Sequence, residues 1–221
     1  MSEALIDIRD VEFSYSPDRP VLGGCNFRLE PGQRVALTGA NGSGKTTLLH
    51  MIVGLVRPSA GRIEIFGKER REEADFHEVR RRIGLLFQDS DDQLFCPTVA
   101  EDTAFGPLNL GLNRDQARQI VSQTLADLGL GGYENRITYQ LSSGEKRLVA
   151  LATVLAMQPD VLLLDEPTNS LDDQSAQRLL EILGRLPQAM ILVSHDREFR
   201  EKLTDQPFLL KQGHLEKVAK R

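Results

Sequence analysis

Hydrophobic and polar positions follow two different periods along the chain, and each period predicts one kind of element. Short apolar runs bounded by Gly, Pro, Asn or Asp predict β-strands. On this basis we expect strands at residues 4–8, 11–15, 26–29, 34–38, 62–65, 84–88, 161–164 and 190–193. The last two runs are apolar throughout, which is typical of strands buried on both faces of a parallel sheet.

Helical spacing dominates between residues 90 and 157. Apolar side chains recur three and four residues apart from Ala117 to Leu128, after Asn113 and Gln116, which have the spacing of a helix-capping pair. Strand and helix patterns alternate on both sides of this block. The order predicts one α/β domain, residues 1–221, with a parallel-sheet core (1–89 and 158–221) and an inserted helical subdomain (90–157).

A glycine-rich motif directly follows the apolar run at residues 34–38. It reads G-x-x-x-x-G-K-[ST] and consists of Gly39, Ala40, Asn41, Gly42, Ser43, Gly44, Lys45 and Thr46, followed by Thr47. The glycines let successive N–H groups turn toward an anion, and the helix that starts there adds its positive end. We expect Lys45 to reach the β- and γ-phosphates and Thr46 to ligate Mg²⁺. The motif predicts a P-loop that binds a nucleotide.

Polar residues follow three further predicted strands. Asp165 and Glu166 end the apolar run at 161–164, so we expect Asp165 to hold Mg²⁺ and Glu166 to act as general base on the attacking water. Gln88 is a candidate ligand of the metal and the lytic water, and His195 a candidate hydrogen-bond partner of the γ-phosphate. A lone Gln or His at a strand end is more often surface polarity. Parallel strands, however, end at one edge of the sheet, where such sheets bind ligands.

The segment from Leu141 to Arg147 reads L-S-S-G-E-K-R. Ser142 and Glu145 have the spacing of a capping box, and a helix start rich in Ser and Gly offers free N–H groups to an anion. With the preceding motifs in this order, the chain resembles the ATP-binding cassette (ABC) ATPases over nearly its whole length. The resemblance implies a P-loop NTPase fold with a RecA-like parallel-sheet core, N-terminal antiparallel β strands and an inserted helical subdomain, and it implies hydrolysis of ATP with Mg²⁺.

In this family the signature segment of one subunit completes the ATP site of another. The signature positions here are Ser142, Ser143 and Gly144, which would contact the nucleotide in trans. The resemblance also implies that Tyr15 stacks on adenine and that Asp172 couples the two sites. The commonest signature has Gly in place of Ser143 and Gln in place of Glu145, which leaves the strength of the phosphate contact open. A second ATPase subunit is implied, either an identical copy or a paralogue.

The residues after Gln88 narrow the resemblance. The run F-Q-D-S-D-D-Q-L-F at residues 87–95 is similar to that of the ATPases of energy-coupling factor (ECF) transporters, and its continuation to Leu112 most resembles the cobalt and nickel branch. The resemblance implies that Asp91, Asp92 and Gln93 dock an integral-membrane ECF-type transmembrane subunit, which works with a substrate-binding membrane subunit. A solvated acidic loop is the alternative interpretation.

The implied function is that of an ATP-hydrolysing motor subunit at the cytoplasmic face of the membrane, in an importer of cobalt or nickel ions. An importer of a vitamin such as biotin is the first alternative. A soluble ABC ATPase acting on DNA or ribosomes is less favoured, because the chain has neither a second cassette nor a coiled-coil insertion.

Composition limits the remaining classes. With 40% hydrophobic and 27% charged residues, the 221-residue chain is an ordinary globular protein, and a net charge of −5 argues against a nucleic-acid partner. Cys25 and Cys96 are too few for a disulfide framework or zinc site, so we expect the transported metal not to be bound here. We expect no signal peptide, and the longest apolar run, 148–157, is too short to cross a bilayer. The basic residues 80–82 are interpreted as a solvated helix end.

Overall fold

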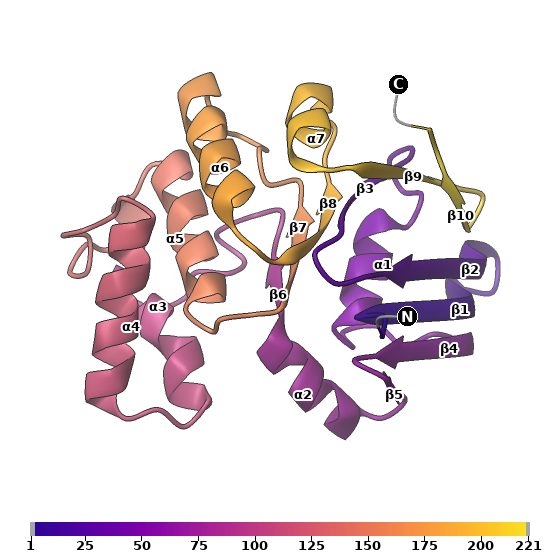
Figure 1. Cartoon of the computed structure of the whole chain (residues 1–221), viewed down its shortest axis with the longest axis horizontal. Helices are drawn as coiled ribbons and strands as arrows, with labels where there is room; N and C mark the ends of the chain where they lie inside the picture. The colour runs from indigo at the N-terminus through magenta and orange to yellow at the C-terminus, as the bar shows by residue number, and fades with distance from the viewer. Residues whose placement is uncertain (1–2, 220–221) are drawn as a thin grey trace.

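The computed structural model describes residues 3–219, which contain two β-sheets with helices between and around them (Figure 1). The first sheet is antiparallel, with strand order β2-β1-β4-β5. Its strands are β1 (Ile6–Ser16), β2 (Arg19–Leu29), β4 (Ala60–Ile65) and β5 (Lys68–Glu69). The second sheet has the order β10-β9-β3-β8-β7-β6, and all its pairs are parallel except β9 with β10. Its strands are β3 (Arg34–Thr38), β6 (Ile83–Leu86), β7 (Val161–Asp165), β8 (Ala189–Val193), β9 (Gln206–Lys211) and β10 (His214–Lys217).

The helices divide between the two faces of the parallel sheet. Helix α1 (Lys45–Ile52) lies between the sheets, and α2 (Glu73–Arg82) leads into β6 (Figure 1). The other helices are α3 (Val99–Asn109), α4 (Arg114–Asp127), α5 (Ser143–Leu155), α6 (Asp173–Arg185) and α7 (Arg197–Leu203), with a short 3₁₀ turn, η1, at Thr138–Gln140. Helices α3, α4 and α5 gather on the side away from the antiparallel sheet. Within residues 3–219, no helix combines the length and the apolar character needed to cross a bilayer.

Strand β7 shows how two hydrophobic cores hold the parallel sheet. Val161 and Leu163 belong to the core that α1 shares with the antiparallel sheet, while Leu162 and Leu164 belong to a second core with α5 and α6. All four side chains are fully buried, as a strand covered on both faces requires. Burying each such side chain contributes about 1.5–3 kcal/mol.

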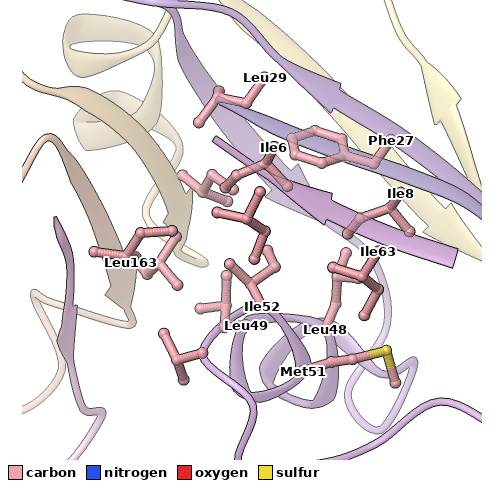
Figure 2. Close-up of a cluster of buried hydrophobic side chains, with 14 of the residues drawn as sticks. Ile6, Ile8, Phe27, Leu29, Leu48, Leu49, Met51, Ile52, Ile63 and Leu163 are labelled. Carbon is pink, nitrogen blue, oxygen red and sulfur yellow. The ribbon is translucent and has the colours of Figure 1, made fainter. Parts of the chain in front are cut away.

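Helix α1 is fixed by the first of these cores. Leu48, Leu49, Met51 and Ile52 are fully buried, and Figure 2 shows them facing side chains of the antiparallel sheet. Leu163 of β7 approaches the same cluster from the parallel sheet. This packing fixes the position of α1. The predicted P-loop leads directly into this helix, so the C-terminal end of the loop is held in place as well.

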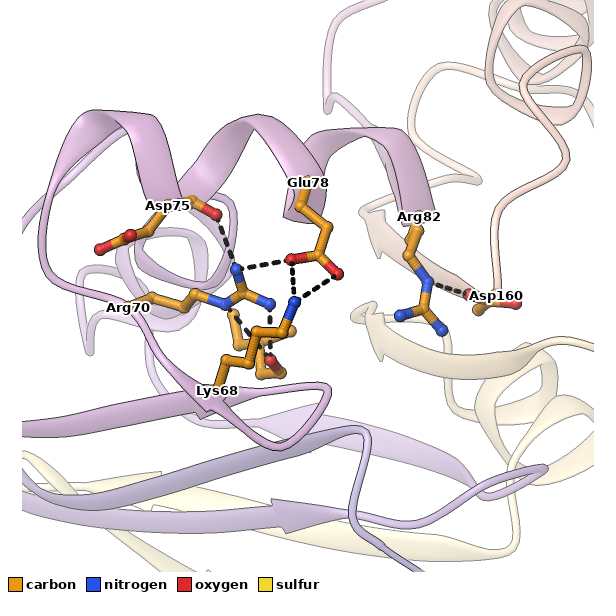
Figure 3. Close-up of polar contacts among 7 residues, drawn as sticks. Lys68, Arg70, Asp75, Glu78, Arg82 and Asp160 are labelled. Carbon is orange, nitrogen blue, oxygen red and sulfur yellow. Dashed lines mark hydrogen bonds and ion pairs between the residues drawn. The ribbon is translucent and has the colours of Figure 1, made fainter.

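A polar network secures the N-terminal half of the molecule around α2. The buried Arg70 donates hydrogen bonds to the Ile65 and Asp75 carbonyls and to the Glu78 carboxylate, as Figure 3 shows. At the other end of α2, Arg82 pairs with Asp160 at 2.6 Å. The cluster at residues 80–82 is thus the end of a helix, as predicted, and two of its guanidinium groups are already engaged within the chain.

The α/β fold class, the parallel-sheet core and the N-terminal antiparallel strands agree with the prediction, but several boundaries differ. The two strands expected at 4–8 and 11–15 form the single strand β1, whose register shifts next to Asp10 at φ 50°. Strand β2 is longer than the 26–29 segment, and β6 ends at Leu86, before Gln88. Residues 90–157 are helical only in α3, α4 and α5, apart from the short turn η1. The division at residues 89/90 and 157/158 stays a prediction.

Candidate active site

The glycine-rich loop connects β3 to α1 and depends on two left-handed glycines. A Cβ at Gly39 (φ 148°) would lie 2.5 Å from the Leu210 carbonyl oxygen, and a Cβ at Gly44 (φ 103°) would lie 2.6 Å from Val21. Only glycine fits these conformations without strain. Lys45 is 8% exposed, and its ammonium group donates hydrogen bonds to the Gly39 and Ala40 carbonyls at 3.0 Å each. The loop therefore encloses one fixed positive charge.

Two carboxylates stand at the same end of the sheet: Asp165 is the last residue of β7, and Glu166 follows it. Asp165 is 3% exposed, and burial raises its pKa, against a hydrogen bond from the Thr46 hydroxyl that lowers it. The backbone of Glu166 has φ 44°, a left-handed conformation that costs free energy for any residue other than glycine. One of its oxygens, Oε2, accepts a hydrogen bond from the His195 backbone N–H at 3.0 Å, and Oε1 lies 3.3 Å from the His195 ring nitrogen Nε2. Both Asp165 Oδ1 and Glu166 Oε1 are buried without a hydrogen-bond partner.

One cavity of about 450 Å³ brings these groups together. Its lining includes Asn41, Gly42, Lys45, Thr46, Gln88, Asp165, Glu166 and His195. The strand ends of β3, β6, β7 and β8 each contribute a residue that the sequence singled out, as expected for parallel strands that end at one edge. The structure thus places the predicted catalytic residues within reach of one ligand, while their individual roles stay predictions.

The residues present fit a magnesium ion. Asp165 Oδ1 is a buried oxygen without a hydrogen-bond partner, the Thr46 hydroxyl lies beside this carboxylate, and Gln88 lines the same cavity. Mg²⁺ prefers oxygen ligands and takes several of them from phosphates and water. Across residues 3–219, no group of three or more His, Cys, Asp or Glu side chains is arranged to hold a metal ion alone. Binding of Mg²⁺ at these residues stays a prediction.

Tyr15 lies next to the start of α1. Its hydroxyl is 3.0 Å from the Thr47 hydroxyl, and its ring meets Phe13 edge-on at 4.9 Å between centroids. The side chain is nevertheless 62% exposed. An anchored aromatic ring with an open face is suited to stacking on a planar base.

The predicted signature residues occupy the start of α5. Ser142 is the N-cap, and its hydroxyl accepts a hydrogen bond from the Glu145 N–H and donates one to Glu145 Oε2. Ser143 lines a second cavity, of about 530 Å³, together with Thr46 and Gln88. None of Ser142, Ser143 and Gly144 lines the cavity that holds Lys45. Within one chain, Ser143 therefore shares a cavity with Thr46 but not with Lys45.

Glu145 serves the cap of its own helix. Its Oε2 accepts the Ser142 N–H at 2.9 Å, and its Oε1 accepts hydrogen bonds from the Tyr133 hydroxyl at 2.8 Å and from Arg136 at 2.9 Å. These bonds, led by the Ser142 N–H, lower the pKa of Glu145 to about 2. The charge of this unusual signature residue is thus compensated within the chain.

Asp172 caps the neighbouring helix, α6. Its carboxylate accepts hydrogen bonds from the N–H and the hydroxyl of Ser175, and the first of these lowers its pKa. Ser175 in turn lies against Gly144, where an added Cβ would come within 2.6 Å of the Ser175 hydroxyl oxygen. The residue predicted to couple two sites is therefore one contact away from the signature.

The three predicted docking residues have different surroundings. Asp91 forms an ion pair with Lys146 of α5 at 2.6 Å, and Asp92 is exposed. Gln93 turns inward: its amide accepts the Phe87 N–H at 3.1 Å and donates to the Ala150 carbonyl and the Thr153 hydroxyl. The side chain of Gln93 therefore attaches the segment to α5, which the sequence reasoning did not foresee.

The sequence reasoning also missed Arg147. This residue is 3% exposed and donates hydrogen bonds to the carbonyls of Phe87 and Gln88. The available signal was an arginine directly before the apolar helix positions Leu148 and Leu151. Such a pattern does not say which backbone groups the guanidinium meets.

Known proteins share both the sequence and the fold. The family profile for ABC transporters matches residues 22–169. The chain is 56% identical over 197 residues to a putative ABC transporter ATP-binding protein of Brucella suis, covering 89% of this chain and 82% of the relative. It is 43% identical over 215 residues to the energy-coupling factor transporter ATP-binding protein EcfA of Methanothermobacter thermautotrophicus, covering 96% and 69%. The fold matches that of CbiO1 from Clostridium perfringens, part of the ABC transporter complex cbiONQ, with a TM-score of 0.87, 33% identity and coverage of 97% and 87%.

The matched region runs from β2 through the glycine-rich loop, the signature helix α5 and the carboxylates at the end of β7. Since sequence, fold and the convergence of strand-end residues agree, the chain belongs to the ATP-hydrolysing subunits of ABC transporters, in the group of energy-coupling factor ATP-binding proteins.

Proposed function

We propose that this chain is the ATP-driven motor subunit of an ECF-type importer for cobalt or nickel ions, at the cytoplasmic face of the membrane. The ATPase part rests on one observation, the cavity that Lys45, Thr46, Asp165, Glu166 and His195 line together. The transport part rests on the similarity to EcfA and to CbiO1.

The chain's own groups have separate tasks in ATP hydrolysis. Lys45 and the loop amides bind the phosphates, and Tyr15 stacks on the base. Thr46, Asp165 and Gln88 would hold Mg²⁺, which when bound neutralises phosphate charge. Glu166 Oε1 is buried without a hydrogen bond, with the His195 ring nitrogen 3.3 Å away, so this oxygen can accept the proton of the attacking water. The hydrogen bond from the His195 N–H holds the other oxygen and so orients the carboxylate.

Hydrolysis then requires a second subunit. In the ABC ATPases that this chain resembles, the signature contacts the nucleotide of the other subunit, so Ser142, Ser143 and Gly144 would act in trans. None of the three lines the Lys45 cavity of its own chain, which is compatible with that role. Asp172, which shares Ser175 with Gly144, would connect the two sites. The partner is either an identical copy or a paralogue.

The Glu166→Gln variant tests this arrangement. It should bind ATP with unchanged affinity but form a long-lived dimer, because the closed state is no longer released by hydrolysis. Size-exclusion chromatography with ATP and Mg²⁺ measures the dimer, and phosphate release measures turnover. Normal turnover by the variant would remove Glu166 as the base, and turnover by a strictly monomeric wild-type chain would contradict the shared site.

A groove beside the acidic segment is the proposed docking surface for the transmembrane subunit. It has a volume of about 340 Å³, and its lining includes Leu55, Asp92, Phe95 and Phe105. Leu55, Phe95 and Phe105 are large apolar side chains exposed to solvent. An apolar groove with an acidic residue suits a partner helix that has apolar and basic side chains, as in other helix-in-groove interfaces.

Changing Asp92, which lines the groove, to Ala should weaken co-purification with the membrane subunits and leave basal ATP hydrolysis intact. Unchanged assembly would refute the docking role. In the reconstituted complex, ATP-dependent uptake of cobalt or nickel tests the substrate, and uptake of biotin in its place would establish the vitamin alternative. We propose no nucleic-acid partner, in keeping with the acidic net charge.

A further inference from the structure

Arg147 is a buried cation on α5 that none of the steps above uses. Its two terminal nitrogens donate to two successive carbonyls, of Phe87 at 2.6 Å and of Gln88 at 2.5 Å. Its Nε is buried without a hydrogen-bond partner. Burial lowers the pKa of Arg147, against the nearby carboxylates of Asp89 and Asp165. Placing a charge here costs free energy, which the two short hydrogen bonds offset.

The backbone at Gln88 has left the sheet. The pairing of β6 with β7 ends at Leu86, opposite Leu164. Beyond this point, residues 87–93 form their longer-range side-chain hydrogen bonds and ion pairs with α5. Arg147 contacts the Phe87 and Gln88 carbonyls, and Lys146 pairs with Asp91. Gln93 donates to Ala150 and Thr153. The segment that carries Gln88 is therefore attached to the signature helix.

Arg147 and Gln88 also face one space. The cavity of about 530 Å³ is lined by Arg147 and Gln88 together with Thr46, Asp165 and Ser143. A change in the position of the Gln88 backbone therefore changes the distance of its amide from Asp165 and Thr46.

We propose that Arg147 is a positioning residue for Gln88: by holding the Phe87 and Gln88 carbonyls, it sets the place of the Gln88 amide in the catalytic cavity. The inference rests on the proposed role of Gln88 at the metal and the lytic water. It gives the start of α5 a second task, because the helix that carries Ser142, Ser143 and Gly144 also holds a group of its own chain's site.

The planar guanidinium is suited to this task. It presents two donors at a fixed separation and so fixes two adjacent carbonyls at once, whereas a lysine ammonium offers a compact charge on a flexible stem. Arg147→Lys keeps the positive charge near Asp165 but loses the fork. This variant therefore separates geometry from electrostatics.

A double-mutant cycle in ATP hydrolysis tests the proposal in the full dimer-forming chain. Arg147→Met should lower kcat by roughly 10- to 100-fold, since small displacements of a catalytic group have effects of this size. Gln88→Ala should lower kcat similarly, and adding Arg147→Met to Gln88→Ala should have no further effect. Arg147→Lys should be impaired almost as much as Arg147→Met.

Arg70→Met is the matched control. Arg70 is also a buried arginine that donates to backbone carbonyls, but it lies beside α2, as Figure 3 shows. It lines neither the cavity of about 450 Å³ nor the one of about 530 Å³. This variant should lower the unfolding midpoint and leave kcat unchanged. Amide hydrogen exchange gives a readout independent of turnover: peptides covering residues 87–93 should exchange faster in Arg147→Met than in the wild type or in Arg70→Met.

The outcomes separate the two claims. If Gln88→Ala lowers kcat but the effects of the two substitutions on kcat multiply in the double variant, the inference is wrong. It is also wrong if Arg147→Lys has wild-type kcat, because Arg147 would then act through its charge or through folding. Unchanged exchange at residues 87–93 also overturns it. If Gln88→Ala itself has wild-type kcat, the proposed role of Gln88 fails, whatever Arg147 does. Should Arg147→Met not fold, the same cycle is run with Arg147→Lys.

Discussion

Replacing Glu145 by Gln tests how the chain tolerates an acidic residue in its signature. The carboxylate makes two kinds of contact: Oε2 completes the cap of α5 on Ser142, and Oε1 accepts hydrogen bonds from Tyr133 and Arg136. A glutamine can keep the cap, because Gln serves in capping boxes as well as Glu. It cannot keep the negative charge that faces Arg136.

The magnitude follows from the pKa of Glu145. It falls from an ordinary value of 4.5 to about 2, and each pKa unit corresponds to about 1.4 kcal/mol, which sets an upper limit of about 3 kcal/mol. Arg136 is 49% exposed, so solvent screening reduces the expected loss to about 1–2 kcal/mol. Because folding lowers this pKa, the contribution is complete above pH 4.5 and is lost as the pH falls toward about 2.

Glu101→Gln provides the matched control. Glu101 forms the same capping box on Thr98 at the start of α3, with the Thr98 N–H and hydroxyl both donating to its Oε2. We expect this control to lose less than about 0.5 kcal/mol. Urea unfolding followed by circular dichroism measures both variants at neutral pH and at a pH of about 4, where the loss caused by Glu145→Gln should begin to shrink. Equal losses in the two variants, or a loss independent of pH, would refute the reasoning.

Three further substitutions or reagents test other parts of the structure. Gly144→Ala should destabilise the protein by about 1–3 kcal/mol, because the new Cβ would lie 2.6 Å from the Ser175 hydroxyl oxygen, and Ser175→Ala in the same chain should recover most of the loss in urea unfolding. Tyr15→Ala should weaken ATP binding by about 1–2 kcal/mol in equilibrium titration, whereas Tyr15→Phe should keep most of the affinity; equal losses would remove stacking as the role of the ring. Burial raises the pKa of Cys25 to about 11, so at mildly alkaline pH this thiol should react with iodoacetamide only after unfolding, and rapid labelling of the folded protein detected by mass spectrometry would contradict its burial.

Local sequence signals predicted the caps of this fold well. The pairs Asn113–Gln116 and Ser142–Glu145 both form capping boxes in the structure. A cap involves residues three positions apart, so its spacing carries nearly all the information. The same holds for the P-loop, where the left-handed conformations of Gly39 and Gly44 are set within one short loop.

The boundaries of β1 and β2 depended on contacts that spacing does not show. The sequence predicted separate strands at 4–8 and 11–15, and Asp10 lies between them. In the structure, its N–H donates to Asn26, and the Asn26 amide donates to the Asp10 carboxylate, so the irregular position is held by a residue 16 positions away. Strand β1 therefore continues through it, in the manner of a β-bulge.

Contacts with residues beyond the local motif also determine the surroundings of Glu145 and Gln88 in the site. From the sequence, Glu145 is expected to disfavour close contact with phosphate unless it caps its own helix, and the structure shows that cap. The structure adds Arg136 and Tyr133, which donate hydrogen bonds to Oε1 of that carboxylate, while Oε2 completes the cap of α5. Gln88 is likewise fixed by an arginine 59 positions away. The residue types at the site were readable because they follow strand ends. Arg147 of α5 meets the Gln88 carbonyl only because that helix packs beside the sheet, and no local spacing in the sequence reports this contact.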